Sequence, residues 1–226
     1  QERNAYLNFL STHDGIGLRP VEGILPDTEL LKYIDFLKKQ GGLLTYRDSQ
    51  GKKTVYEVNI TLFNALKNTY AGNDSYSLER FTLAHTILFS LEGIPAVYIL
   101  NLFGTENDYK KVKVTNVNRS INRTNWDYEK LAKKLNNKLS KNFQIYNKLK
   151  KIMILRKKQP AFHPNATQFT LQLKDCFFGL WRQSIDRSQS IFCISNLTNE
   201  EKQLPLLEIN LISTNNWFDI LTKKKI

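Results

Sequence analysis

The chain has 226 residues, of which 41% are hydrophobic and 12% aromatic, enough to build a core and to exclude a disordered tail. Lysine and arginine number 33 against 21 acidic residues, a formal net charge of +12 that makes nucleic acid or an anionic surface a partner to consider. No apolar run approaches the roughly 20 residues of a membrane span, so we expect no membrane partner and a cytoplasmic location. Cys176 and Cys193 lie in apolar runs, which favours buried, reduced thiols.

The first elements in chain order are a strand, a loop and a helix. The apolar run Ala5–Leu10 indicates a strand, and FLSTHDGIGLRP then places His13 and Asp14 between that run and two glycines. In barrel enzymes, catalytic side chains lie at the C-terminal ends of strands and on the loops that follow them. The alternative is that Asp14 caps the next element and His13 fills a polar pocket. Apolar residues at helical spacing then predict a helix from Pro26 to Gly41.

The middle of the chain alternates irregular segments with helices and one apolar strand. The segment Gly41–Asn59 predicts an irregular excursion with at most a hairpin, and Ile60–Leu66 a short helix. A stronger helix ends at Gly93. The run GIPAVYIL, Gly93–Leu100, is typical of a strand buried on both faces of a parallel sheet. The polar stretch Asn101–Trp126 then indicates a long loop.

The last part of the chain predicts a helix and then a small β domain. The helix covers Asn142–Lys158, and Pro160 ends it. Five short β segments are expected beyond it: FTLQL, CFFGLWRQ, QSIFCISNL, LPLLEINL and NWFDIL. We therefore expect two domains, an α/β domain over residues 1–160 with inserted loops 15–58 and 101–126, and an antiparallel β domain over residues 165–226.

Five motifs between about Tyr6 and Trp126 carry a resemblance to a known family. They are, in order, HDGIGLRP, YEVN, GIPAVY, GTEND and RSINR. Together they resemble the sucrose phosphorylase subfamily of the α-amylase superfamily, glycoside hydrolase family thirteen. The segments HDGIGLRPVEGILPD, GGLLTYR and YEVN are more similar to glucosylglycerate phosphorylase and its relatives. Plain sucrose phosphorylases usually carry Gln where this chain has Glu57, and an acidic residue where it has Thr54. The resemblance implies the C-terminal part of a (β/α)8 TIM barrel, with its last strands and helices, followed by a small antiparallel all-β domain.

The resemblance also implies roles for five side chains. Asp14 would be the transition-state stabiliser, and His13 its neighbour in the glucose-binding subsite. Arg119 would hold the far hydroxyls of the glucosyl ring, and Tyr56 and Glu57 would face the leaving group or the incoming phosphate. A fixed carboxylate suits the positive charge that develops in an oxocarbenium-like transition state, and a guanidinium suits bidentate bonding to sugar oxygens. No metal or cofactor is implied.

The implied reaction is that of a retaining α-glucoside phosphorylase. Such an enzyme transfers glucose from an α-glucoside, here sucrose or glucosylglycerate, to phosphate and releases α-glucose 1-phosphate; with water in place of phosphate it would be a hydrolase. Retaining enzymes need a nucleophile and a general acid/base. In this superfamily both precede the HD motif, so we expect the chain to be the C-terminal part of a larger enzyme, inactive alone, with the N-terminal half of the barrel as its partner.

Two other classes of function remain to be weighed. The stretch Lys130–Lys158 holds ten lysines and Arg156 but no acidic residue, which is compatible with an RNA-binding protein. Its aromatics, Phe143 and Tyr146, lie on the apolar stripe of the expected helix, so we expect no nucleic-acid partner. The other class is a noncatalytic carbohydrate-binding module. Without the resemblance, Arg119 would be a solvated charge on a basic loop.

Overall fold

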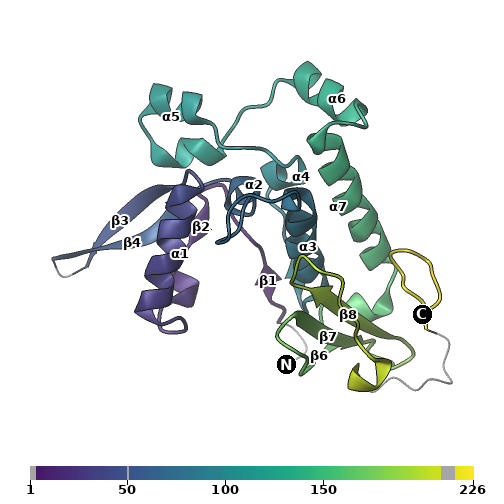
Figure 1. Ribbon diagram of the computed structural model, residues 1–226. Coiled ribbons are helices and arrows are strands. Elements are labelled where there is room, and N and C mark those ends of the chain that lie inside the picture. The colour runs from purple at the N-terminus through teal and green to yellow at the C-terminus, as the bar shows by residue number, and fades with distance from the viewer. Residues whose placement is uncertain (1–3, 50, 210–216) are drawn as a thin grey trace. The chain divides into compact units, whose positions relative to one another are not determined.

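The computed structural model describes residues 4–49, 51–209 and 217–226 (Figure 1). Its strands are β1 (Leu7–Asn8), β2 (Ile16–Gly17), β3 (Leu43–Ser49), β4 (Lys52–Asn59), β5 (Ile94–Pro95), β6 (Thr167–Thr170), β7 (Phe177–Gln183) and β8 (Ser190–Asn196). Its α-helices are α1 (Asp27–Lys39), α2 (Leu62–Ala65), α3 (Ser77–Ser90), α4 (Ile99–Leu102), α5 (Tyr109–Thr115), α6 (Tyr128–Asn136) and α7 (Lys141–Lys157). Short 3-10 turns are η1 (Arg19–Val21), η2 (Asn118–Asn122), η3 (Pro160–Phe162) and η4 (Leu206–Ile209). The expected α/β class is confirmed.

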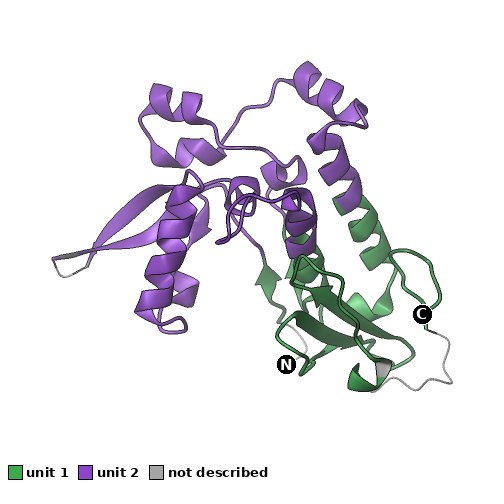
Figure 2. Cartoon of the chain, viewed as in Figure 1, with its two compact units in different colours: residues 1–8, 85–96, 149–226 green, residues 9–84, 97–148 purple. Residues whose placement is uncertain are grey.

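The chain forms two compact units (Figure 2). Unit 1 contains residues 1–8, 85–96 and 149–226, and unit 2 contains residues 9–84 and 97–148. Each unit is therefore built from segments that are distant in the sequence.

Unit 2 is organised around the long hairpin β3–β4. Strand β2 pairs with β4, which gives an antiparallel sheet in the order β2-β4-β3. Helix α1 covers this sheet because its apolar residues recur at helical spacing, and its Ile34 and Leu37 pack in one core with Leu18, Val58 and Ile60. Acidic residues in its first turn and lysines in its last turn complement the helix dipole.

Unit 1 contains a parallel strand pair and an antiparallel sheet. Leu7 pairs with Ile94 in the parallel pair β1–β5, and β6, β7 and β8 form the antiparallel sheet in that order. Arg182 on β7 is fully buried, and its guanidinium donates hydrogen bonds to the carbonyls of Ser90, His163 and Ala166. This side chain ties the end of α3 to the sheet.

The expected strand Gly93–Leu100 is wrong over most of its length. The strand covers only Ile94–Pro95, half of the Ile94 surface is exposed, and Ile99–Leu102 forms helix α4. A short apolar run does not by itself distinguish a buried strand from a helix, which explains the difference. The strand expected over Ala5–Leu10 is likewise limited to Leu7–Asn8.

The expected long loop Asn101–Trp126 contains helices. The Asp108 carboxylate caps the start of α5 by accepting a hydrogen bond from the Lys111 amide, and Asn116 ends this helix in the left-handed conformation. The 3-10 turn η2 follows directly. Both capping residues are recognisable in the sequence, but the high polarity of the segment obscured them.

Further expectations hold for the helices and fail near the C-terminus. The helices expected after Pro26, over Ile60–Leu66, before Gly93 and over Asn142–Lys158 are all present, as is the hairpin. The segment LPLLEINL forms the 3-10 turn η4 instead of a strand, and its last two residues lie outside the described residues. In NWFDIL, Phe218 makes only an isolated bridge with Lys225, and Asn216 is not described. No helix within the described ranges is long and apolar enough to cross a bilayer.

Candidate active site

The HDG motif forms a tight turn in unit 2. The amide of Thr12 donates to the Gly15 carbonyl at 3.1 Å and the amide of Gly15 to the Thr12 carbonyl at 3.2 Å, while the Asp14 amide donates to the Thr12 hydroxyl at 3.2 Å. Gly15 has a φ of +125°, and an added Cβ would lie 2.3 Å from the Val58 carbonyl oxygen. The turn therefore requires glycine at position 15, because the backbone there lies too close to β4 to leave room for a Cβ.

Strand pairing brings the YEVN motif to this turn. The turn runs directly into β2, whose Ile16 and Gly17 pair with Val58 and Glu57 of β4. This pairing explains why residues more than 40 positions apart in the sequence meet. The Glu57 side chain is buried, and the neighbouring Tyr56 is half-buried.

Arg119, on η2, joins the two motifs. Its Nε and Nη2 atoms donate to the two Glu57 carboxylate oxygens at 3.1 and 3.0 Å, and Nη2 also donates to the Tyr56 hydroxyl at 2.8 Å. Its Nη1 atom lies 3.5 Å from Asp14 Oδ2. One guanidinium group thus contacts three of the predicted site residues, in the bidentate geometry that arginine favours with carboxylates.

The Asp14 carboxylate has two further neighbours. Arg123 donates from Nη2 to Asp14 Oδ1 at 2.5 Å, and His13 Nε2 lies 3.2 Å from the same oxygen. Both carboxylate oxygens therefore face a guanidinium group. His13 is exposed, while about a quarter of the Asp14 side-chain surface remains accessible. A partly accessible, firmly held carboxylate can interact with a ligand without having to reorient.

The electrostatics of this cluster are nearly balanced. Two arginines face the carboxylates of Asp14 and Glu57, and hydrogen bonding to Glu57, reinforced by the charges of both carboxylates, raises the pKa of Arg119. Burial raises the pKa of the nearby Tyr98, an effect that the positive charge of Arg123 opposes. Arg119 therefore stays charged at neutral pH.

The structure brings together all five residues that the sequence predicts for the site: His13, Asp14, Tyr56, Glu57 and Arg119. Their roles stay predictions. Sequence reasoning missed Arg123 as a partner of Asp14. The signal was the spacing in RSINR, which places one arginine on η2 and a second, four residues later, directly after that turn. No group of three or more His, Cys, Asp or Glu side chains suited to a metal occurs in the described part of the chain.

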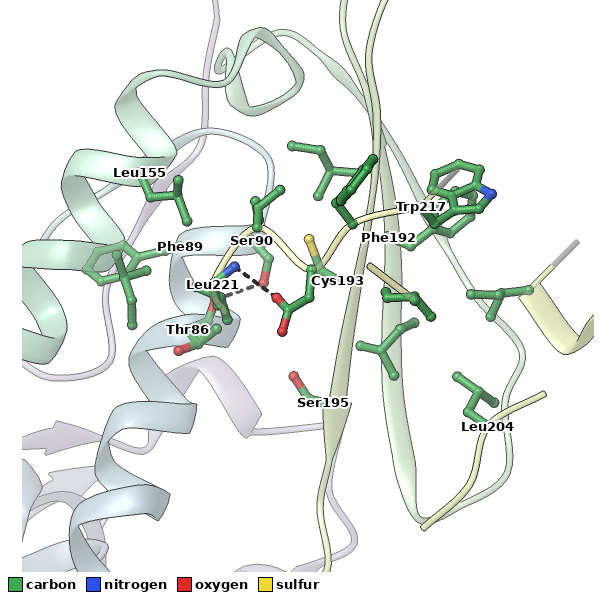
Figure 3. Close-up of a pocket in the computed structure, with 18 of the residues that line it drawn as sticks. Thr86, Phe89, Ser90, Leu155, Phe192, Cys193, Ser195, Leu204, Trp217 and Leu221 are labelled. Atoms are coloured by element: carbon green, nitrogen blue, oxygen red, sulfur yellow. Dashed lines mark hydrogen bonds between the residues drawn. The ribbon is translucent and has the colours of Figure 1, made fainter. Parts of the chain in front are cut away.

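A separate cavity of about 500 Å³ lies in unit 1 (Figure 3). Its walls include Phe89, Leu155, Phe192 and Trp217, and burial raises the pKa of the Cys193 thiol beside them to about 11. A thiol with so high a pKa is a poor nucleophile at neutral pH. None of the five predicted site residues lines this cavity, whose charged lining residues are Arg156, Lys202 and Asp219.

Comparisons with known proteins agree with the resemblance in the motifs. No protein-family model matches the chain. The chain is 32% identical over 206 residues to the glucosylglycerate phosphorylase of Escherichia coli, a match that covers 90% of this chain and 36% of that enzyme. It is also 32% identical over 129 residues to the sucrose phosphorylase of Streptococcus mutans, covering 56% of this chain and 25% of that enzyme.

A solved structure supports the fold. The crystal structure of a sucrose 6F-phosphate phosphorylase from Thermoanaerobacter thermosaccharolyticum superimposes with a TM-score of 0.69 and 23% identity, over 84% of this chain and 36% of that one. The matches correspond to the C-terminal part of the relatives. The chain spans about a third of the length of the glucosylglycerate phosphorylases that it matches.

Proposed function

Because the chain is homologous to the C-terminal part of glucosylglycerate and sucrose phosphorylases of the α-amylase superfamily, we propose that it forms part of a retaining α-glucoside phosphorylase. The reaction transfers a glucosyl unit from an α-glucoside to phosphate and yields α-glucose 1-phosphate. Glucosylglycerate is the favoured donor, because the match to phosphorylases of that name covers far more of the chain than the match to a sucrose phosphorylase. This portion would supply the transition-state stabiliser and the acceptor side of the site.

The observation that carries the proposal is the cluster of Asp14, Arg119, Arg123, Glu57 and Tyr56. A retaining mechanism passes through a transition state with positive charge at the anomeric carbon. The Asp14 carboxylate, which two guanidinium groups fix in place, is suited to stabilise this charge without reorganisation. His13 beside it would donate to a sugar hydroxyl.

The acceptor side of the site would be formed by Tyr56 and Glu57. Arg119 contacts both of them and also approaches Asp14, so one guanidinium group links the acceptor side to Asp14. Arg119 would also reach the far hydroxyls of the glucosyl ring. Binding of phosphate or glycerate, both anionic, next to Glu57 would call for additional positive charge or for a rearrangement of the Arg119–Glu57 pair.

We also propose how the fold relates to that of the longer relatives. The parallel pair β1–β5 would correspond to the last two strands of the barrel, and the sheet β6-β7-β8 to the β domain that follows it. In this assignment residues 1–160 belong to the barrel and residues 165–226 to the β domain. A two-stranded parallel sheet is marginal by itself, which favours further strands beside it in the active enzyme.

A hybrid enzyme tests this proposal. It joins the N-terminal part of the E. coli glucosylglycerate phosphorylase to this chain, in place of that enzyme's own C-terminal part. We expect the hybrid to release α-glucose 1-phosphate from glucosylglycerate in the presence of phosphate. The variant Asp14→Asn should fold but lower kcat by roughly a hundredfold or more, the effect of losing one preorganised transition-state contact.

The matched control is Asp35→Asn, which removes an exposed carboxylate paired with Lys39. An exposed pair of this kind contributes little, so this variant should retain full activity. Formation of free glucose in place of α-glucose 1-phosphate would identify a hydrolase. Equal activity of Asp14→Asn and Asp35→Asn would remove Asp14 from the site.

A further inference from the structure

Three asparagine side chains hold the turn that carries His13 and Asp14. Asn59 donates from Nδ2 to the Asp14 carbonyl at 2.8 Å, and Asn122 donates to the Thr12 carbonyl at 2.8 Å. Asn101 donates to the Ser11 hydroxyl at 2.9 Å. All three residues are at most 4% exposed. They belong to three different elements, β4, η2 and α4, so three separate parts of the chain hold the turn.

Asn59 also contacts the acceptor side of the candidate site. The Nδ2 group that donates to the Asp14 carbonyl also donates to Glu57 Oε1. The side-chain oxygen of Asn59, Oδ1, accepts a hydrogen bond from the Thr45 hydroxyl at 2.5 Å. One fully buried side chain therefore connects the Asp14 backbone, the Glu57 carboxylate and the neighbouring strand β3. A purely apolar residue at this position would leave three polar groups without this partner.

Asn122 is not the residue that stability alone would favour. Its carbonyl Oδ1 is buried and makes no hydrogen bond to any described residue, which costs free energy. Its amide is committed to the Thr12 carbonyl, and its own backbone carbonyl accepts from the Tyr98 hydroxyl at 2.8 Å. The side chain thus serves the turn at the expense of an unpaired acceptor.

We infer that Asn59 and Asn122, assisted by Asn101, are positioning residues that fix the Asp14 carboxylate between Arg119 and Arg123, and that Asn59 couples this position to Glu57. The inference rests on the proposed function for the catalytic role of Asp14. The physical argument is one of distance. An error of about 1 Å in the position of a catalytic group can reduce the rate roughly a hundredfold, and a backbone held at two carbonyls and a hydroxyl has little freedom to move.

The first experiment uses NMR on the 226-residue chain and does not depend on activity. The variant Asn59→Leu keeps the approximate shape but removes the amide. The control is Asn142→Leu, because Asn142 is also buried, lies in unit 2 and donates to a backbone carbonyl outside the turn, that of Phe103. Asn59→Leu should speed exchange of the Arg123 guanidinium protons with water by about 3- to 10-fold, while Asn142→Leu should leave it unchanged.

The second experiment measures kinetics in the hybrid enzyme. Asn59→Leu should lower kcat by roughly 10- to 100-fold with little change in the KM for phosphate, whereas Asn142→Leu should change neither at a temperature where both are folded. The milder pair Asn59→Ser and Asn142→Ser replaces them if a leucine variant does not fold.

The two experiments separate failure of this inference from failure of the proposed function. An inactive hybrid would contradict the proposed function, and the exchange measurement on the chain would still decide whether Asn59 positions Asp14. Equal guanidinium exchange in the Asn59 and Asn142 variants would overturn the inference. A fall in kcat of the same size in both variants would overturn it as well, because it would show a general loss of packing.

Discussion

Arg119 and Glu57 form the contact that, in the proposed function, borders the acceptor side of the site. The guanidinium group donates from Nε and Nη2 to both carboxylate oxygens of Glu57 and from Nη2 to the Tyr56 hydroxyl, so Nη1, which lies 3.5 Å from Asp14 Oδ2, is the part left for a ligand. A neutral residue at position 57 would weaken this pairing and release the guanidinium group. Under the proposed function, the residue at position 57 therefore affects how much of the positive charge of Arg119 is available to an anionic acceptor.

We predict that Glu57→Gln changes acceptor preference in the hybrid enzyme more than it changes turnover. Glutamine keeps the size of the side chain but loses the charge that holds Arg119, and hydrogen bonds between charged groups are worth about 1.5–3 kcal/mol. The ratio of initial rates with glycerate and with fructose, both measured with α-glucose 1-phosphate as donor, should change by roughly tenfold or more. Equal ratios in the two enzymes would place Glu57 outside the acceptor side.

A second residue-scale prediction concerns Cys193 in unit 1. Burial raises the pKa of its thiol to about 11, whereas a thiol in an unfolded chain has a pKa of about 8.5. The folded state therefore retains this proton over a range in which the unfolded state has lost it. The free energy of unfolding should be unaffected below about pH 8.5 and fall by up to roughly 1.4 kcal/mol per pH unit between about pH 9 and 11.

Denaturant unfolding at several pH values measures this effect. Other groups titrate in the same range. The informative quantity is therefore the difference in the free energy of unfolding between the wild-type chain and Cys193→Ala. Cys176→Ala is the matched control. A difference that does not vary with pH for Cys193→Ala would contradict the proposed environment of the thiol.

At the scale of elements, the sequence predicts helices better than strands. Helix α1 is predictable because its apolar spacing and the glycines after it agree, and the hairpin β3–β4 is predictable from turn residues between short apolar pieces. Helix α5 was missed because it is short and polar and has no buried residue, so that only its capping residues mark it. The two-residue strands β1 and β5 are set by their pairing with each other, which no local pattern reveals.

In the candidate site, too, local features were predictable from the sequence and long-range contacts were not. Its residue types were predictable from motifs, but the antiparallel pairing of β2 with β4, which brings Asp14 to Glu57, is a long-range contact. The three asparagines were not predictable either, because asparagine is common in this chain and only the structure distinguishes those that bond the turn. Identity of side chains is a local property, whereas their positioning depends on tertiary contacts.

We predict that Gly15→Ala destabilises unit 2 and that Gly17→Ala does not. Gly15 has a φ of +125°, and a Cβ would clash with the Val58 carbonyl, whereas a Cβ at Gly17 would meet nothing within 4 Å. A strained backbone of this kind costs roughly 1–3 kcal/mol, and the clash adds to that value. Chemical denaturation of both variants provides the measurement, and equal stabilities would contradict the described turn.

At the scale of the whole molecule, part of the positive charge is paired with carboxylates inside unit 2. Lys141 pairs with Glu106 at 2.9 Å and Lys148 lies 3.6 Å from Glu79, while the ring of Tyr146 lies 6.2 Å from that of Phe103. These contacts account for part of the basic stretch Lys130–Lys158 without nucleic acid. They favour packing over RNA recognition as the reason for its composition.

The last prediction concerns the activity of the 226-residue chain by itself. A retaining mechanism requires one carboxylate that attacks the sugar and a second that gives up a proton. In the described cluster both Asp14 and Glu57 are engaged by guanidinium groups, and the proposed function assigns the nucleophile and the proton donor to the N-terminal part of the longer enzyme. We expect the chain alone to release no phosphate from α-glucose 1-phosphate with glycerate, fructose or glycerol as acceptor. The measurement is phosphate release over several hours at high protein concentration, with the hybrid enzyme as the positive control. Turnover by the chain alone that Asp14→Asn abolishes would show that these carboxylates suffice for catalysis, and the division of labour proposed for this site would then be wrong.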